Sequence, residues 1–217
     1  MEDFMIPMNK DIVKNKTRSI KDYLYFLVYF NNFYFYHNFP FILTSYIILY
    51  FLKGPFWYKA MTYMIAGFSS WFFHWLAHQL KYFNLYSGHQ YHHQEKTTFL
   101  EDVHEFVSDM FAAGIFLMII NFLGKEFGVH LFNDYVLLFF MIAFPMVHLF
   151  TYHKVLKKSY HQEHHEETSH NFSPDFFDHI FNTNLDHRIE DNSHMVPIFL
   201  CVGVIVILIQ RYKVLIF

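Results

Sequence analysis

Five apolar stretches recur along this chain of 217 residues, and groups of histidines lie between and around them. About 20 apolar residues suffice for one helical crossing of a bilayer. Inside the bilayer a helix satisfies all of its own backbone polar groups, so each stretch is expected to be helical. The sequence therefore predicts an all-α integral membrane bundle with about four to five spans, at residues 38–52, 56–73, 106–123, 131–150 and 195–210.

The composition agrees with a membrane protein and excludes two other classes. Hydrophobic residues make up 54% of the chain, aromatic residues 23% and charged residues only 16%, which is too apolar for an ordinary soluble domain. A formal net charge of −3 provides no basic patch for a nucleic-acid partner. The single cysteine, Cys201, excludes both a disulfide and a cysteine-based zinc site.

The domain organisation follows from where polar and apolar segments alternate. Residues 1–22 are polar and lack the apolar core and the cleavage site of a secretory signal, so they are expected to stay on the mature protein in the cytosol. We expect one membrane domain, 1–217. Its parts are N-terminal interfacial and transmembrane helices at 23–73, a histidine-motif region at 74–194 interrupted by a transmembrane hairpin at 106–150, and a C-terminal apolar helix at 195–217.

Sixteen of the seventeen histidines fall between His74 and His194, and ten of them form four short groups. Residues three or four apart on a helix share a face, so the side chains of three of these groups can converge on one point. Five residues separate the histidines of HLFTYH, a rotation of roughly 140° on an α-helix. Either that helix breaks near Thr151, with Pro145 upstream as a cause, or its two histidines serve different roles. The predicted metal ligands are His74, His78, His89, His92, His93, His148, His153, His161, His164 and His165.

All four groups must lie on one side of the bilayer to build one site. A hairpin of two spans that turns near Gly124 to Gly128 permits this arrangement. Most lysines and arginines fall on the same side, which the positive-inside rule makes cytosolic. The sequons at Asn15 and Asn171 are therefore predicted to carry no glycan.

Ligand type and number indicate the metal. Neutral imidazole suits Zn, Cu, Fe and Ni. Eight to ten histidines are too many for one tetrahedral zinc, but they would fill two five- or six-coordinate ions and leave positions for a small oxidant. Two irons that activate dioxygen match this pattern best, with zinc expected only as a substitute in purified protein.

Other polar residues near the motifs are candidates for additional or supporting contacts. His170, His179, Asp178 and Asn171 lie in the loop that carries the last motif. Carboxylates could orient imidazole N–H groups, although solvated loop positions are equally consistent with the sequence. Trp71 and the aromatic residues after it are typical of a membrane interface. The candidate carboxylates are Asp102, Glu105, Asp109, Asp178 and Asp186.

The block KKSYHQEHHEETSHNFSPDFFDHIFNT resembles the closing signature of the fatty acid hydroxylase and sterol desaturase superfamily, whose integral-membrane members carry HxxxH and two HxxHH motifs. The resemblance covers about residues 60 to 185. The middle of the chain is more similar to bacterial carotene hydroxylases, and Lys154 to His165 is closer to fatty acid 2-hydroxylases. Ser173 stands where the superfamily often has glycine, Asn182 replaces the glycine before Thr183, and four residues separate the histidines of HLFTYH. The matching residues are His161, His164, His165, Asn171, Phe172, Asp178, Phe181 and Thr183.

The resemblance implies a non-haem di-iron enzyme that uses dioxygen and two external electrons to hydroxylate or desaturate a fatty acyl, sterol or carotenoid lipid. It implies an electron donor of the cytochrome b5 or ferredoxin type. The expected membrane is the endoplasmic reticulum in a eukaryote or the cytoplasmic membrane in a bacterium.

Three other functions are alternatives to this enzyme. A zinc protease is disfavoured because neither HExxH nor HxxEH occurs: position 108, after His104 and Glu105, is not histidine, and Glu163 lies one position early for the inverted motif. A histidine-rich metal-binding or metal-transport protein is expected to carry ionisable residues inside its spans. A catalytically inactive member of the superfamily also fits the motifs.

Overall fold

The computed structural model describes residues 34–89, 93, 98–155, 163–165, 169–184 and 189–212, with side chains at 152–155 excepted. In this part of the chain the regular structure is helical and contains no strand. The all-α class is therefore confirmed. The elements are α3 (Phe39–Phe51), α4 (Phe56–Gln79), α5 (Lys81–Ser87), α7 (Phe99–Met110), the π-helix η1 (Phe111–Ile115), α8 (Phe116–Glu126), α9 (Asp134–Met146), the π-helix η2 (Val147–Val155), α11 (Asp175–Phe181), the 3₁₀ turn η3 (Asn192–Met195) and α12 (Val196–Arg211).

Three helical runs within the described ranges are long and apolar enough to cross a membrane: Phe99–Glu126, Asp134–Thr151 and Asn192–Arg211. They correspond to the last three predicted stretches: the first and third extend past both predicted bounds, and the second begins three residues later and ends one residue later than predicted. The first stretch appears as α3, which has 13 residues, and the second as α4, which has 24 residues and continues to Gln79. The chain thus has the apolar helices of a membrane protein, and the total of four to five spans stays a prediction.

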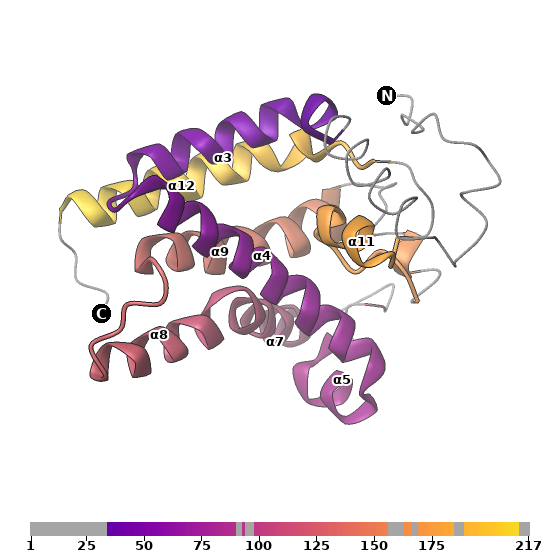
Figure 1. The fold of residues 1–217 in the computed structure, drawn as a ribbon. Coiled ribbons are helices and arrows are strands. Elements are labelled where there is room, and N and C mark those ends of the chain that lie inside the picture. The colour runs from indigo at the N-terminus through magenta and orange to yellow at the C-terminus, as the bar shows by residue number, and fades with distance from the viewer. Residues whose placement is uncertain are drawn as a thin grey trace, which may run out of the picture.

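The helices pack along their lengths around a shared apolar core. In Figure 1, α3 and α12 lie side by side, and α9 lies between this pair and the rod formed by α7, η1 and α8. Val136 and Phe139 of α9 are fully buried, as is Val206 of α12, and Ile48 of α3 completes this contact. Because helix α9 is apolar on nearly all sides, it occupies the centre of the bundle.

A polar network closes the hairpin between α8 and α9. The Asn121 amide donates to the Phe132 carbonyl and to Asp134, and the Lys125 ammonium lies 2.7 Å from an Asp134 carboxylate oxygen. Helix α8 ends at Glu126, so the turn forms where the sequence predicted it. His148 lies roughly 20 Å from this turn, at about 1.5 Å per residue. The hairpin returns the chain to the end where α4 stops (Figure 1).

Helix α9 lies very close to the rod at Gly114, which lies within η1. A Cβ atom added there would stand 2.6 Å from the Met141 Cβ and 3.0 Å from the Leu137 carbonyl oxygen. Only glycine permits this separation. The Ala112 carbonyl, also within η1, accepts a hydrogen bond of 2.7 Å from the Ser69 hydroxyl of α4. A neighbouring helix thus satisfies a backbone group in the irregular segment.

Several sequence predictions lie outside the described residues. They are the N-terminal segment 1–22, the first part of 23–73 up to residue 33, the side chain of His153, and the whole of His92, His161, Asp186 and residues 213–217.

Candidate metal centre

The last turns of α4 carry the first histidine pair of the centre. His74 and His78 are four residues apart, and their ring centroids lie 5.4 Å from one another, as expected for one helical face. His74 is buried and His78 is half-buried. Helix α4 continues past the end of the predicted span, so both imidazoles are presented by regular helix.

The second group follows the short helix α5, which ends at Gly88 in a left-handed conformation with φ of 74°. This turn directs His89 back toward α4, where its Nε2 lies 2.7 Å from the Nε2 of His78. His93 follows, with its Nε2 3.1 Å from that of His89. A side chain at position 88 would also meet the His104 ring at 2.7 Å, so glycine is required there for two reasons.

His164 joins the cluster from the third motif and is fully buried. Its Nε2 lies 3.1 Å from the Nε2 of His74 and 3.0 Å from that of His78. Its Nδ1–H donates to the carbonyl of His170, which leaves Nε2 as the nitrogen with a lone pair. The ring of His165 lies 4.8 Å from that of His93. The structure therefore fixes the tautomer that turns the lone pair of His164 toward the cluster.

Five Nε2 atoms meet in four contacts of 2.7 to 3.1 Å, in the order His74, His164, His78, His89, His93. An Nε2 of neutral imidazole offers either one hydrogen or one lone pair, so no more than two of the four contacts can be linear hydrogen bonds at once. A cation would instead accept a lone pair from each nitrogen. Ligand nitrogens about 2.1 Å from one ion, at right angles to each other, lie about 3 Å apart. The donor set therefore fits a metal ion.

Burial keeps these imidazoles neutral. It lowers the pKa of His93 to about 4, with a smaller contribution from the neighbouring His78, and it lowers the pKa of His164 further. The pKa of His89 also lies well below its usual range, for the same reason. Neutral imidazole is the form that binds metals. The site is thus ready to bind a metal at neutral pH.

His148 reaches the cluster from η2, and its ring centroid lies 5.6 Å from that of His74. The helix does not break near Thr151, as one sequence interpretation required; it widens into a π-helix over Val147–Val155. In a π-helix the backbone hydrogen bond joins residues that are five apart. Positions 148 and 153 therefore lie nearer to the same side of the helix than they would on an α-helix. Two carboxylates contact this histidine: its Nδ1 lies 2.6 Å from Asp109 Oδ2 and 3.8 Å from Glu105 Oε1.

Seven of the ten predicted ligands have described side chains, and the structure brings all seven together. Two groupings have ligand atoms within 4.8 Å of one another, His74 with His78, His89 and His164, and Glu105 with Asp109 and His148. The chain therefore contains groups that could hold a metal ion, and ligation by each residue stays a prediction. The seven are His74, His78, His89, His93, His148, His164 and His165.

Asp178 holds together the loop that follows the last histidine motif. The hydrogen bonds described for its carboxylate come from backbone, indole and hydroxyl groups. Asp178 accepts hydrogen bonds from the backbone N–H groups of Phe172 and Ser173, from Trp71 Nε1 and from the Thr183 hydroxyl. Burial raises the pKa of Asp178 to about 7, although the hydrogen bonds from Thr183 and Ser173 oppose this shift. The loop holds the Phe172 ring within 5.4 to 5.9 Å of three cluster imidazoles.

The other candidates of this loop have different contacts. His170 contributes its carbonyl to His164, and its ring contacts the Ser169 hydroxyl at 2.7 Å. His179 is buried with its Nε2 3.2 Å from Asp175. Asn171 has φ of 57° and donates its backbone N–H to the Thr183 carbonyl. Trp71 is buried, and its indole N–H donates to Asp178; its predicted place at a membrane interface stays a prediction.

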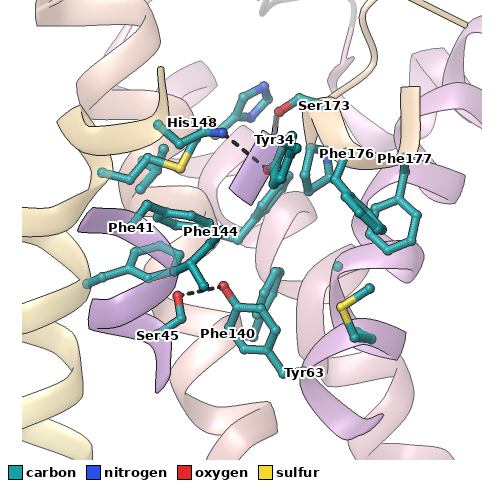
Figure 2. Close-up of a pocket in the computed structure, with 18 of the residues that line it drawn as sticks. Tyr34, Phe41, Ser45, Tyr63, Phe140, Phe144, His148, Ser173, Phe176 and Phe177 are labelled. Atoms are coloured by element: carbon teal, nitrogen blue, oxygen red, sulfur yellow. Dashed lines mark hydrogen bonds between the residues drawn. The ribbon is translucent and has the colours of Figure 1, made fainter. Parts of the chain in front are cut away.

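A cavity of about 370 Å³ lies beside the centre and is lined almost entirely by apolar side chains. Figure 2 shows His148 and Ser173 at one end and the Ser45–Tyr63 pair, joined at 3.2 Å, at the other. The walls come from α3, α4, α9, α11 and α12, which are far apart in the sequence. Sequence reasoning missed this cavity because no local pattern marks its lining. Further lining residues include Tyr34, Phe41, Phe140, Phe144 and Phe177.

No family model matches this chain, and neither a curated protein nor a solved structure matches it. Functional inference therefore depends on the motifs and on the geometry of the centre.

Proposed function

We propose that this chain is a membrane-bound di-iron oxygenase that hydroxylates or desaturates a lipid. One observation carries the proposal: His148 belongs both to the imidazole cluster and to the wall of the apolar cavity. A hydrocarbon chain in the cavity would place one of its carbons beside the metal ligands. Ligand pockets of this kind are concave and mostly apolar, with a few polar groups that set orientation.

The stoichiometry defines what the protein must arrange. Hydroxylation converts a C–H bond, dioxygen, two electrons and two protons into an alcohol and one water. Desaturation consumes the same reactants and releases an alkene and two waters. Bound iron would supply the reductive activation of dioxygen. The apolar walls would exclude water from the reacting carbon, and Phe140 and Phe144 would position the chain.

Two backbone conformations support membership in the fatty acid hydroxylase and sterol desaturase superfamily. Ser173 and Asn182 stand where that superfamily often has glycine, and each has a φ of 56°. This left-handed region is costly for most residues and is easily adopted by glycine. The two departures from the motif thus occur where the backbone itself favours glycine, and asparagine is among the residues that tolerate this region.

The proposal includes a location and partners. Three apolar helical runs support association with a bilayer. We propose that the histidine motifs face the cytosol, in the endoplasmic reticulum of a eukaryote or the cytoplasmic membrane of a bacterium. Electrons would come from a cytochrome b5-type or ferredoxin-type protein.

The test uses the full chain purified in detergent or nanodiscs. We expect bound iron and oxygen-dependent conversion of added lipid in the presence of a reductant. In His164→Ala we expect weaker iron binding and loss of the conversion. Lipid profiles of cells that express the two proteins should differ in a hydroxylated or unsaturated product. Identical profiles, together with an iron-loaded protein that turns over no lipid, would refute the proposed activity.

The role of the cavity has its own test. Gly67 lines the cavity, and a Cβ there would stand 3.1 Å from the Phe177 ring. Gly67→Leu should fill the space and abolish turnover while iron binding is retained. Val204→Phe enlarges an exposed residue of α12 and should leave turnover unchanged. Equal turnover in Gly67→Leu and in the wild type would show that the substrate binds elsewhere.

Metal transport is a second candidate, favoured by one observation. Glu105 is buried and Asp109 largely so, and both lie within a helical run long enough to cross a membrane. Intramembrane carboxylates are costly and usually functional. Metal flux into liposomes without lipid product would support transport, whereas product without flux would support the oxygenase.

A further inference from the structure

Two carboxylates lie beside the imidazole cluster on one face of α7. Glu105 and Asp109 are four residues apart, and their side chains are 3% and 14% exposed. An ionised carboxylate inside an apolar helix bundle is stable only with a compensating partner. His148 faces both carboxylates, through Nδ1. These three residues form one polar island between α7 and η2.

The island has the dimensions of a metal site. One ligand atom from each of Glu105, Asp109 and His148 lies within 4.8 Å of the other two. Two carboxylates and one imidazole are a donor set suited to divalent iron or manganese. Two carboxylates also balance the charge of a divalent cation, which the neutral imidazoles of the first grouping do not.

A small cavity of about 40 Å³ adjoins the island. Its lining includes Asp109, His74 and His89, together with the Ser70 and Ser108 residues. A volume of about 10 to 15 Å³ already holds one water molecule, provided polar partners are present. This cavity therefore offers room for a water molecule between the two groupings.

We propose that Glu105, Asp109 and His148 hold a second metal ion beside the imidazole-bound one, so that the two positions of the centre differ in ligand chemistry. The first position is bound by neutral nitrogen donors alone, and the second carries two anionic oxygen donors. The inference deepens the proposed function, on which its catalytic meaning rests. It also changes the role of the carboxylates from orienting a histidine to binding the ion.

The alternative is that Asp109 only orients His148 by accepting its Nδ1–H. Asp109→Asn separates the two roles because the asparagine oxygen still accepts that hydrogen bond, whereas the negative charge is lost. Glu105→Gln makes the same change one helical turn earlier. The matched control is Glu126→Gln, an exposed carboxylate at the end of the same helical run.

The experiment measures Fe²⁺ bound to the full chain under anaerobic conditions, by mass spectrometry of the metal after gel filtration. Wild type and Glu126→Gln should bind two ions. Asp109→Asn, Glu105→Gln and the double variant should bind the second ion at least about tenfold more weakly, with the first unchanged. His164→Ala should instead weaken the first ion. Circular dichroism and the melting temperature confirm folding, and only variants with wild-type values are compared.

Two ions bound with wild-type affinity in the double variant would overturn the inference, as would a wild type that binds only one. The proposed function fails separately: two carboxylate-dependent ions without oxygen-dependent lipid turnover would refute the oxygenase and leave the second site intact. Lipid turnover by a double variant that still binds both ions would refute the carboxylate site and leave the proposed oxygenase intact.

Discussion

The Nε2 atom of His164 lies 3.1 Å from the Nε2 of His74, although ninety residues separate them in the sequence. Both side chains are buried, and two apolar helical segments lie between them along the chain. Such a contact forms only if the hairpin of α8 and α9 returns to the end where α4 stops. The relationship therefore joins the membrane topology to the chemistry of the centre.

His164→Ala should weaken metal binding by at least about tenfold. It removes an imidazole whose Nε2 contacts the Nε2 atoms of His74 and His78 and whose tautomer is fixed by the His170 carbonyl. Metal titration of the purified protein measures the effect. His130→Ala is the control, since His130 is exposed at the opposite end of the bundle. Equal weakening in both variants would contradict a specific role for His164.

Asp178→Asn should lower the free energy of unfolding by about 2 kcal/mol. The asparagine NH2 group is itself a donor, so it cannot accept the hydrogen bonds that one carboxylate oxygen of Asp178 accepts. Four donors converge on this side chain, so no orientation of the amide satisfies all of them. Thermal unfolding in detergent measures the loss. Glu126→Gln, on an exposed surface, should change stability little. An unchanged melting temperature in Asp178→Asn would show that the loop does not depend on this carboxylate.

Gly114→Ala should cost about 1 to 3 kcal/mol, because the new Cβ would overlap Met141 and push α9 away from η1. The shift should also separate His148 from Asp109 and weaken metal binding. Val204→Ile adds one methyl group to an exposed position of α12 and is the control. Wild-type stability in Gly114→Ala would mean that the bundle adjusts without strain.

The metal-free protein should lose stability as the pH falls from about 6.5 toward 4. Burial lowers the pKa of His93 from its usual 6.5 to about 4 in the folded protein. Between these values His93 binds a proton more readily in the unfolded chain than in the folded one, so its titration makes acid favour unfolding, and its full contribution is present above pH 6.5. Melting temperatures in detergent at pH 7.5 and 5 test this. His93→Gln should reduce the pH dependence, and a pH-independent melting temperature in the wild type would contradict the prediction.

Local periodicity was sufficient to predict the long apolar helices and the histidine groups that the structure brings together. The apolar lengths predicted the helical runs 99–126, 134–151 and 192–211 to within a few residues at most ends. The spacing of His74 and His78 predicted one shared face, which the structure contains. Glu105 and Asp109 are also four residues apart, in a helix that continues into an apolar run. This spacing could have predicted that the two carboxylates share one helical face. Two sequence features partly indicated the π-helix at His148: Pro145 just before it, and the separation of five residues between His148 and His153.

The sequence by itself determined that the chain is helical and apolar and which histidines lie close along each helix, because these properties depend on neighbours within one or two turns. Only the tertiary structure decided that Trp71 is buried against Asp178, that Glu105 and Asp109 face His148, and that five helices line an apolar cavity. These contacts join segments that are distant in the sequence. Their formation depends on how whole helices pack, and no short-range pattern records the rotation and depth at which one helix meets another.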